Sequence, residues 1–284
     1  MKIAYTLNGL VGGFMSTENK SMTSKDNHES KKSSEKSLSY KEESLLTLKY
    51  CTKFLKKYVL DNNDIDIFIF SWETDREKEF NKYLNPKKMK LIPQIDFEIP
   101  EHLKGKNDRR VLAHYSRWYG VKEVMKLKRE YEEENNFKYD LVVNARFDLC
   151  YNKPFDFSSL PTNEFHIPIH PDKVHYGWPT SSPEILDHIF ASSSDNMDMY
   201  SNLFDKLNEY TLPDQCSRWN TISNHFLMVW HLWKLNLTDV DIVKKSFSTY
   251  TSKKADNNKG KTNYDIMRYR KLSIEDVEKE LEDE

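Results

Sequence analysis

An apolar segment that ends in a charged pair is the feature of this sequence best suited to chemistry. The segment Leu141–Ala145 is followed at once by Arg146, Phe147 and Asp148. In an open α/β sheet the carboxyl end of a strand faces the ligand crevice, so a carboxylate there can hold Mg²⁺ or Mn²⁺ against a diphosphate. Arg146 can meet a phosphate oxygen directly through its planar fork of donors. The alternative is structural, with Arg146 and Asp148 pairing only with each other.

Two other apolar runs, residues 3–7 and 65–70, predict further strands with polar carboxyl ends. The residues at these ends are Asn8 and Gly9 after the first run, and Ser71, Trp72 and Glu73 after the second. Because parallel strands end at one edge of a sheet, we expect Glu73 at the same edge as Asp148, with Trp72 near a nucleotide base.

The strands alternate with amphipathic patterns that predict helices. This alternation predicts an α/β fold with a mostly parallel, Rossmann-like central sheet and helices on both faces. The predicted helices are residues 42–60, 76–83, 109–134, 196–207 and 222–235, and further strands are expected near residues 88–92, 165–169 and 185–191.

Two segments differ from this pattern. Residues 16–39 are rich in Ser, Lys, Glu and Asn with almost no apolar side chains, so they predict a disordered insertion. Residues 273–284 are acidic and helix-prone, which predicts a peripheral C-terminal tail. The interpretation is therefore one domain, residues 1–272, with an insertion at 16–39 and a tail.

The composition excludes several classes of protein. Charged residues make up 31% of the 284 residues and nearly cancel to a net charge of −2, so neither nucleic acid nor an anionic membrane is expected as a partner. No apolar run approaches the length of a membrane span, and none resembles a signal peptide. Three widely spaced cysteines favour a reducing compartment, and a cytoplasmic location is expected.

Four segments resemble a group of GT-A-type glycosyltransferases from surface-polysaccharide and lipopolysaccharide gene clusters, phages and large viruses, among them the WavE-type proteins. They are residues 66–73 (DIFIFSWE), 116–121 (SRWYGV), 139–149 (YDLVVNARFDL) and 190–200 (FASSSDNMDMY). In that group an RxDL strand end stands where other GT-A enzymes carry a metal-binding motif.

The resemblance implies a GT-A-like fold and transfer of a sugar from a nucleotide-sugar donor to a glycan or other hydroxyl acceptor, as in polysaccharide biosynthesis. A viral member would act in the host cytoplasm. Asp148 would bind Mn²⁺ or Mg²⁺ and the diphosphate, with Arg146 beside it. The cofactor-binding residues would be Asn8, Gly9, Ser71, Trp72, Glu73 and Arg117.

An inverting transferase needs a group to take the acceptor's proton. The candidates are Asp195, Asp198 and Asp214, while Asn224 stands where the group often carries a glutamate. The rival interpretation is therefore a non-catalytic protein that binds a nucleotide sugar or glycan. An oxidoreductase is disfavoured because residues 8–13 do not form GxGxxG.

Overall fold

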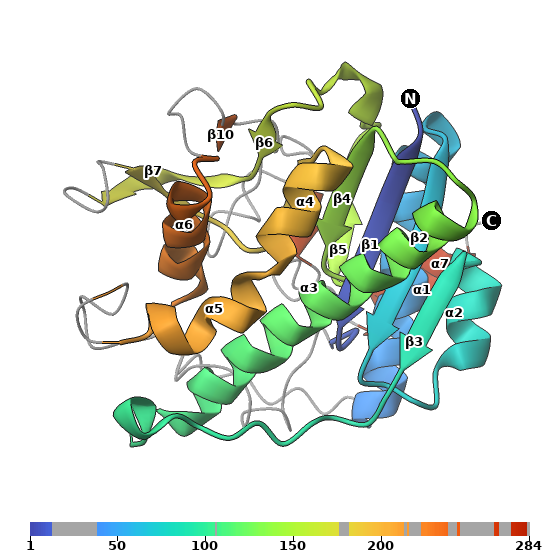
Figure 1. Ribbon diagram of the computed structural model, residues 1–284. Helices are drawn as coiled ribbons and strands as arrows, with labels where there is room; N and C mark the ends of the chain where they lie inside the picture. Colours follow the sequence, from blue (N-terminus) through green and yellow to red (C-terminus); the bar gives the residue numbers. More distant parts are fainter. Residues whose placement is uncertain are drawn as a thin grey trace.

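The segments Ile3–Gly9 and Ile65–Ser71 are buried on both faces, as parallel strands inside an α/β fold must be. They form β1 and β2 in a seven-stranded sheet of order β10-β6-β9-β4-β1-β2-β3 (Figure 1). Within this sheet β9 is antiparallel to its neighbours β4 and β6, and the other paired strands are parallel. The remaining strands are β3 (Lys88–Leu91), β4 (Leu141–Ala145), β6 (Phe165–His166), β9 (Ile189–Ser192) and β10 (Val243–Lys244).

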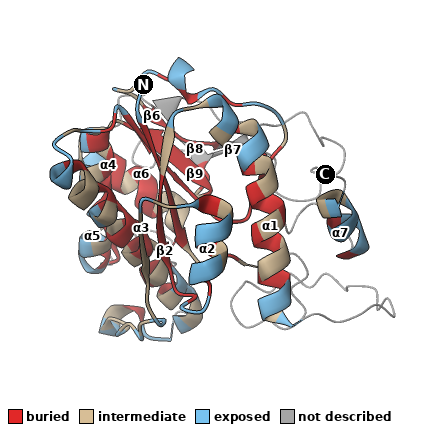
Figure 2. Ribbon diagram, turned by 90° about the vertical axis from the view of Figure 1, so that its right-hand side faces the viewer, coloured by how far each residue is buried: buried red, intermediate tan, exposed pale blue. Residues whose placement is uncertain are grey.

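Alternation along the strands divides the core into two layers. Phe68 and Phe70 of β2 pack on the face covered by α3, α4, α5 and α6, whereas Ile67 and Ile69 face α1 and α2. Figure 2 shows the buried strands between these two layers. The predicted α/β class, with a mostly parallel sheet and helices on both faces, is confirmed. The helices are α1 (Tyr40–Tyr58), α2 (Glu77–Leu84), α3 (Asp108–Glu134), α4 (Ser194–Ser201), α5 (Leu203–Tyr210), α6 (Asn224–Lys234) and α7 (Ile274–Glu282).

The computed structural model shows what begins the longer helices. Ser39 and Glu42 form a capping box at the start of α1, so Ser39, which was assigned to the insertion, belongs to the helix. Asn107 caps α3 through a side-chain bond to the Arg110 amide. The rest of the predicted insertion lies outside the described residues, which are 1–12, 39–105, 107–175, 182–212, 215, 223–237, 243–244, 264–266 and 274–282.

The C-terminal helix α7 is docked on α1 rather than trailing from the fold. Ile274 and Val277 are buried against Tyr50 and Cys51, and Tyr50 Oη donates to Glu280 Oε2 at 2.5 Å. Two apolar side chains one turn apart, those of Ile274 and Val277, therefore pack this acidic helix against α1. Within the described part of the chain, no helix is both long and apolar enough to cross a membrane.

Smaller elements complete the fold and were not expected from the sequence. Two two-stranded sheets flank the main one, and the segment predicted as one strand near residues 185–191 is two strands with a turn between them. These elements are β5 (Leu149–Tyr151) with β11 (Tyr264–Ile266), β7 (Ile169–His175) with β8 (Ser182–Ile185), and the 3₁₀ turns Leu60–Asn62, Glu101–Leu103 and Phe157–Ser159.

Candidate functional site

The parallel strands β1, β2 and β4 end side by side, and we call these ends the carboxyl edge. Gly9 pairs in register with Ser71, and Leu7 pairs with Ala145. Ser71 Oγ donates to Gly9 O at 2.8 Å. Gly9 has a φ of 103°, where a side chain would strain the backbone. The structure therefore brings Gly9 and Ser71 to the edge at which β4 delivers Arg146.

Arg146 and Asp148 form a two-pronged ion pair in the turn after β4. Arg146 Nε donates to Asp148 Oδ1 at 2.9 Å, and Nη2 donates to Oδ2 at 2.7 Å. Phe147, between them, packs into the core and stacks on Phe80 of α2 with ring centroids 5.3 Å apart. The Asp148 side chain is 8% exposed and that of Arg146 is 25% exposed. The pairing expected under the structural alternative is present, and the guanidinium is its more accessible partner.

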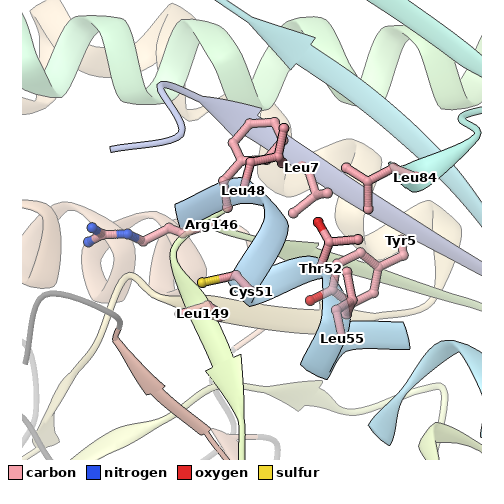
Figure 3. A pocket seen from close by; sticks show the side chains of 10 residues that line it. Tyr5, Leu7, Leu48, Cys51, Thr52, Leu55, Leu84, Arg146 and Leu149 are labelled. Atoms are coloured by element: carbon pink, nitrogen blue, oxygen red, sulfur yellow. The ribbon is translucent and has the colours of Figure 1, made fainter. Parts of the chain in front are cut away.

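The core beneath this turn contains a small cavity, shown in Figure 3. Its volume is about 10 Å³, close to the minimum for one water molecule. Apolar side chains such as Leu7 and Leu48 line it, and the Arg146 guanidinium points away from them. This cavity is therefore too small to hold a sugar or a nucleotide.

A second guanidinium, that of Arg117 on α3, lies at the same edge. Arg117 Nη2 donates to Asp187 O at 2.9 Å, and Arg146 N donates to the adjacent carbonyl, His188 O, at 3.1 Å. Arg117 Nη1 also approaches Asn8 Oδ1 at 3.5 Å. The turn between β8 and β9 thus holds the two arginine-bearing segments next to each other.

Asp187 is a charged residue of this edge that the sequence did not predict. Its Oδ2 accepts a hydrogen bond from Asn224 Nδ2 at 2.9 Å, and Asn224 Oδ1 accepts one from Trp118 Nε1 at 3.0 Å. Burial alone would raise the pKa of Asp187, but the charges of Arg117 and Arg146 outweigh burial and hold that pKa well below its ordinary value. The lowered pKa makes Asp187 a weaker base than an ordinary carboxylate, so its carboxylate is poorly suited to accepting the acceptor's proton.

Buried polar side chains connect β1 and β4 directly behind the site. Asn144 Nδ2 donates to Thr6 Oγ1 and to Asn8 Oδ1, each at 2.9 Å. Helix α3 passes so close that a Cβ on Gly120 would lie 3.0 Å from Asn8 Nδ2. The predicted residue Asn8 is thus fixed between Asn144 and α3, where it supports Arg117.

Glu73, at the end of β2, makes structural contacts. Its Oε1 accepts hydrogen bonds from Val11 N and Tyr40 Oη, each at 3.2 Å, and its Oε2 accepts one from Arg76 Nε at 3.3 Å. Val11 precedes and Tyr40 follows residues 13–38, so Glu73 joins the two ends of that segment. Burial raises the pKa of Glu73 despite these donors.

Trp72 follows β2 at the same edge but belongs to the core. It is 7% exposed, stacks on Tyr119 with centroids 5.6 Å apart and meets Phe70 edge-on. The expectation that Trp72 stacks on a nucleotide base would require it to leave these contacts.

Asp195 and Asp198 are not brought to Asp148. Because β9 runs antiparallel to β4, with Ser192 opposite Val142, helix α4 begins beside the start of β4 rather than its end. Both carboxylates therefore lie at the opposite edge of the sheet, which we call the amino edge.

Their partners at the amino edge are cations. Asp195 pairs with Lys138, which precedes β4. Asp198 Oδ1 lies 2.9 Å from Lys128 Nζ and 3.1 Å from Arg129 Nη1. The expectation that Asp195 or Asp198 takes a proton beside Asp148 is corrected by this topology, and Asp214 lies outside the described residues.

The donor set at Asp148 does not fit the expected Mn²⁺ or Mg²⁺. Both carboxylate oxygens accept hydrogen bonds from Arg146, whose positive charge would face the ion. Over the residues whose positions are described, no group of three or more His, Cys, Asp or Glu side chains could hold a metal ion. Asp148 would have to release Arg146 before it could bind a cation.

Comparison with known proteins gives likenesses to solved structures. No protein-family model and no curated protein matches the chain. Its structure is similar to that of a glycosyltransferase involved in the glycosylation of the major capsid of PBCV-1, with 99% of each chain covered, 13% sequence identity and a TM-score of 0.44. At this TM-score, function has to be inferred from the residues of the carboxyl edge.

Proposed function

We propose that the chain is a glycosyltransferase that moves a sugar from a nucleoside diphosphate sugar to a hydroxyl group of a glycan or another acceptor. The observation that carries this proposal is a pair of guanidinium groups, Arg117 and Arg146, held at the carboxyl edge by contacts with Asp187 and Asp148. Guanidinium groups match the charge and geometry of phosphate oxygens. An open α/β sheet binds its ligands at this edge.

The RxDL motif supports the same proposal independently. Residues 146–149 resemble the strand end of GT-A-type glycosyltransferases, and Arg146 and Asp148 of that motif are the residues found in the two-pronged pair. The resemblance and the geometry therefore favour the same ligand class, a sugar nucleotide with a diphosphate.

In the proposed reaction, the acceptor oxygen bonds to the anomeric carbon while the bond from that carbon to the diphosphate oxygen breaks. The acceptor's proton passes to solvent water, and negative charge develops on the departing nucleoside diphosphate. Arg117 and Arg146 are already oriented by fixed partners, so they can stabilise this charge without reorganising. Losing one such preorganised group costs a typical enzyme about 10²- to 10³-fold in rate.

A non-catalytic nucleotide-sugar or glycan-binding protein is the second candidate. The observation in its favour is Asn224, whose amide is held between Trp118 and Asp187 and cannot accept a proton as a glutamate would. A binding protein would use the same two arginines but would not break the bond to the diphosphate.

The two candidates are separated by measuring release of nucleoside diphosphate from a panel of nucleotide sugars, with added oligosaccharides as acceptors. Arg117→Gln is compared with Lys122→Gln, a surface change on the same helix that removes an ion pair with Asp205. We expect release by the wild type and by Lys122→Gln, and at least an about 10²-fold loss in Arg117→Gln. Saturable donor binding without release would support the binding protein, and neither binding nor release would contradict both candidates.

A further inference from the structure

We infer that Arg117 and Arg146 bind the nucleotide's diphosphate directly, without a divalent cation, and that Asp148 is a positioning residue that holds Arg146. This inference rests on the proposed function, because it names how the donor is recognised.

The first observation is that both carboxylate oxygens of Asp148 are hydrogen-bonded to Arg146. Its two oxygens accept from Nε and Nη2 of one guanidinium, at 2.9 and 2.7 Å. This two-pronged geometry fixes the plane of the Arg146 side chain as well as its position. With its side chain 8% exposed, against 25% for Arg146, the carboxylate lies behind the guanidinium and the guanidinium faces outward.

The proximity of the two arginines is the second observation. The Arg117 guanidinium and the backbone N–H of Arg146 donate to the successive carbonyls of Asp187 and His188. Burial lowers the pKa of Arg117, the negative charge of Asp187 opposes this, and the positive charge of Arg146 lowers the pKa further. The two guanidinium groups therefore act on each other electrostatically, and one diphosphate, which carries more than one negative charge, can interact with both.

The hydrogen bonding of the Arg117 side chain is the third observation. Arg117 Nε is buried and, within the described residues, has no hydrogen-bond partner. Arg117 Nη2 is satisfied by a backbone carbonyl, and the Asp187 carboxylate is shared with the amide of Asn224. Arg117 therefore keeps one N–H donor that no group within the described residues accepts, and such a donor favours a nearby anion.

A guanidinium keeps its charge at any physiological pH. Binding through Arg117 and Arg146 should therefore be unaffected by a chelator, whereas a site built on a cation held by Asp148 would lose its affinity. These two arrangements predict opposite results in one titration.

The experiment titrates the full chain with UDP, GDP, CDP, ADP and dTDP by calorimetry, once with excess EDTA and once with MnCl₂. We expect at least one nucleoside diphosphate to bind with the same Kd in both buffers. Arg146→Lys keeps the charge but loses the two-pronged geometry, so it should weaken that binding by about 10-fold or more in both buffers. Arg129→Lys, an arginine paired with Asp198 at the amino edge, is the matched control and should leave Kd unchanged.

Asp148→Asn separates the two roles of the carboxylate. If Asp148 positions Arg146, Asp148→Asn should weaken nucleoside diphosphate binding equally with EDTA and with Mn²⁺. If Asp148 binds a metal ion, Asp148→Asn should remove only the additional affinity that Mn²⁺ provides. Melting temperatures of all variants establish that each is folded. Binding that requires Mn²⁺ in the wild type would overturn this inference and leave the glycosyltransferase proposal standing, whereas no binding of any nucleoside diphosphate in either buffer would overturn both.

Discussion

The two edges of the sheet hold similar charged residues in different surroundings. At the amino edge, Lys128 is fully buried and its Nζ contacts Glu132 and Asp198, each at 2.9 Å, and Ser194 at 2.5 Å. We call these four residues the amino-edge cluster.

The carboxyl edge is no more exposed than the amino edge, where Arg129 is 34% exposed, but its hydrogen bonding differs. Arg146 retains 25% exposure although it is paired, and Arg117 has a buried Nε without a hydrogen-bond partner among the residues described. A charge cluster whose hydrogen bonds are satisfied within the protein serves the fold, whereas a set that keeps a donor without a partner favours a nearby anion. Charged residues alone do not mark a site. The two edges differ in whether the hydrogen-bond donors of their cations all have partners.

The largest effect on stability is expected at the amino edge. Lys128→Met removes the central cation and leaves Glu132 and Asp198 without it, which should lower the free energy of unfolding by about 3–5 kcal/mol. Urea denaturation measures this, with Lys122→Met on the same helix as the exposed control. Donor turnover per folded molecule should not change. A variant as stable as the wild type would mean that the amino-edge cluster is not a structural unit.

A smaller loss is expected where α3 meets the carboxyl edge. Gly120→Ala places a Cβ 3.0 Å from Asn8 Nδ2, so α3 or Asn8 must shift, at a cost of about 1–3 kcal/mol. Since Arg117 is one turn away on α3, donor affinity should fall as well. Thermal unfolding and donor titration on one preparation check both effects, and a stabilised variant with unchanged affinity would contradict the close packing.

The effect of Glu73→Gln should depend on pH. Burial raises the pKa of Glu73 in the folded protein above its ordinary value of 4.5. The folded state therefore binds this proton more tightly, and the stability this contributes is present below about pH 4.5 and lost as pH rises through the raised value. Glutamine does not titrate, so the loss of stability in Glu73→Gln relative to the wild type should become smaller as pH rises from about 4.5 towards neutral. Melting temperatures measured across this range should converge, and curves that stay parallel would show that the carboxyl does not titrate differently on folding.

The smallest effect is expected for Lys138→Ala. Lys138 and Asp195 form an exposed ion pair, with side chains 63% and 71% exposed, at the amino edge. Such pairs contribute little, so neither melting temperature nor donor turnover should change measurably. A loss of turnover would return Asp195 to the list of candidate catalytic residues.

The sequence predicted most of the fold because its strands and helices carry local signals. The apolar runs of β1, β2 and β4 and the three-and-four spacing of α1 and α3 each predict their element within a few residues. Sheet topology carries no such signal. Nothing local distinguishes the antiparallel strand β9 from its parallel neighbours, so Asp195 and Asp198 were expected at the carboxyl edge and lie at the amino edge.

Apart from Arg117, which the family resemblance supplied, the candidate site was predicted where a residue directly ends a parallel strand. Arg146 and Asp148 follow β4, and Gly9 and Ser71 end β1 and β2. Asp187 was missed because it lies in a turn that only the pairing of β9 places beside β4. Its one local signal is the polar Asp187-His188 interruption within an apolar run, a pattern that many surface turns share.

The most direct test of the central claim, that the carboxyl edge is the functional edge, is kcat/KM for the donor in Arg146→Gln and Arg129→Gln measured side by side. Both substitutions remove a partly exposed arginine from an ion pair with an aspartate, at opposite edges of the sheet. We predict a loss of at least about 10²-fold for Arg146→Gln and no change for Arg129→Gln. Equal values for the two variants, or a loss confined to Arg129→Gln, would contradict the assignment of function to the carboxyl edge.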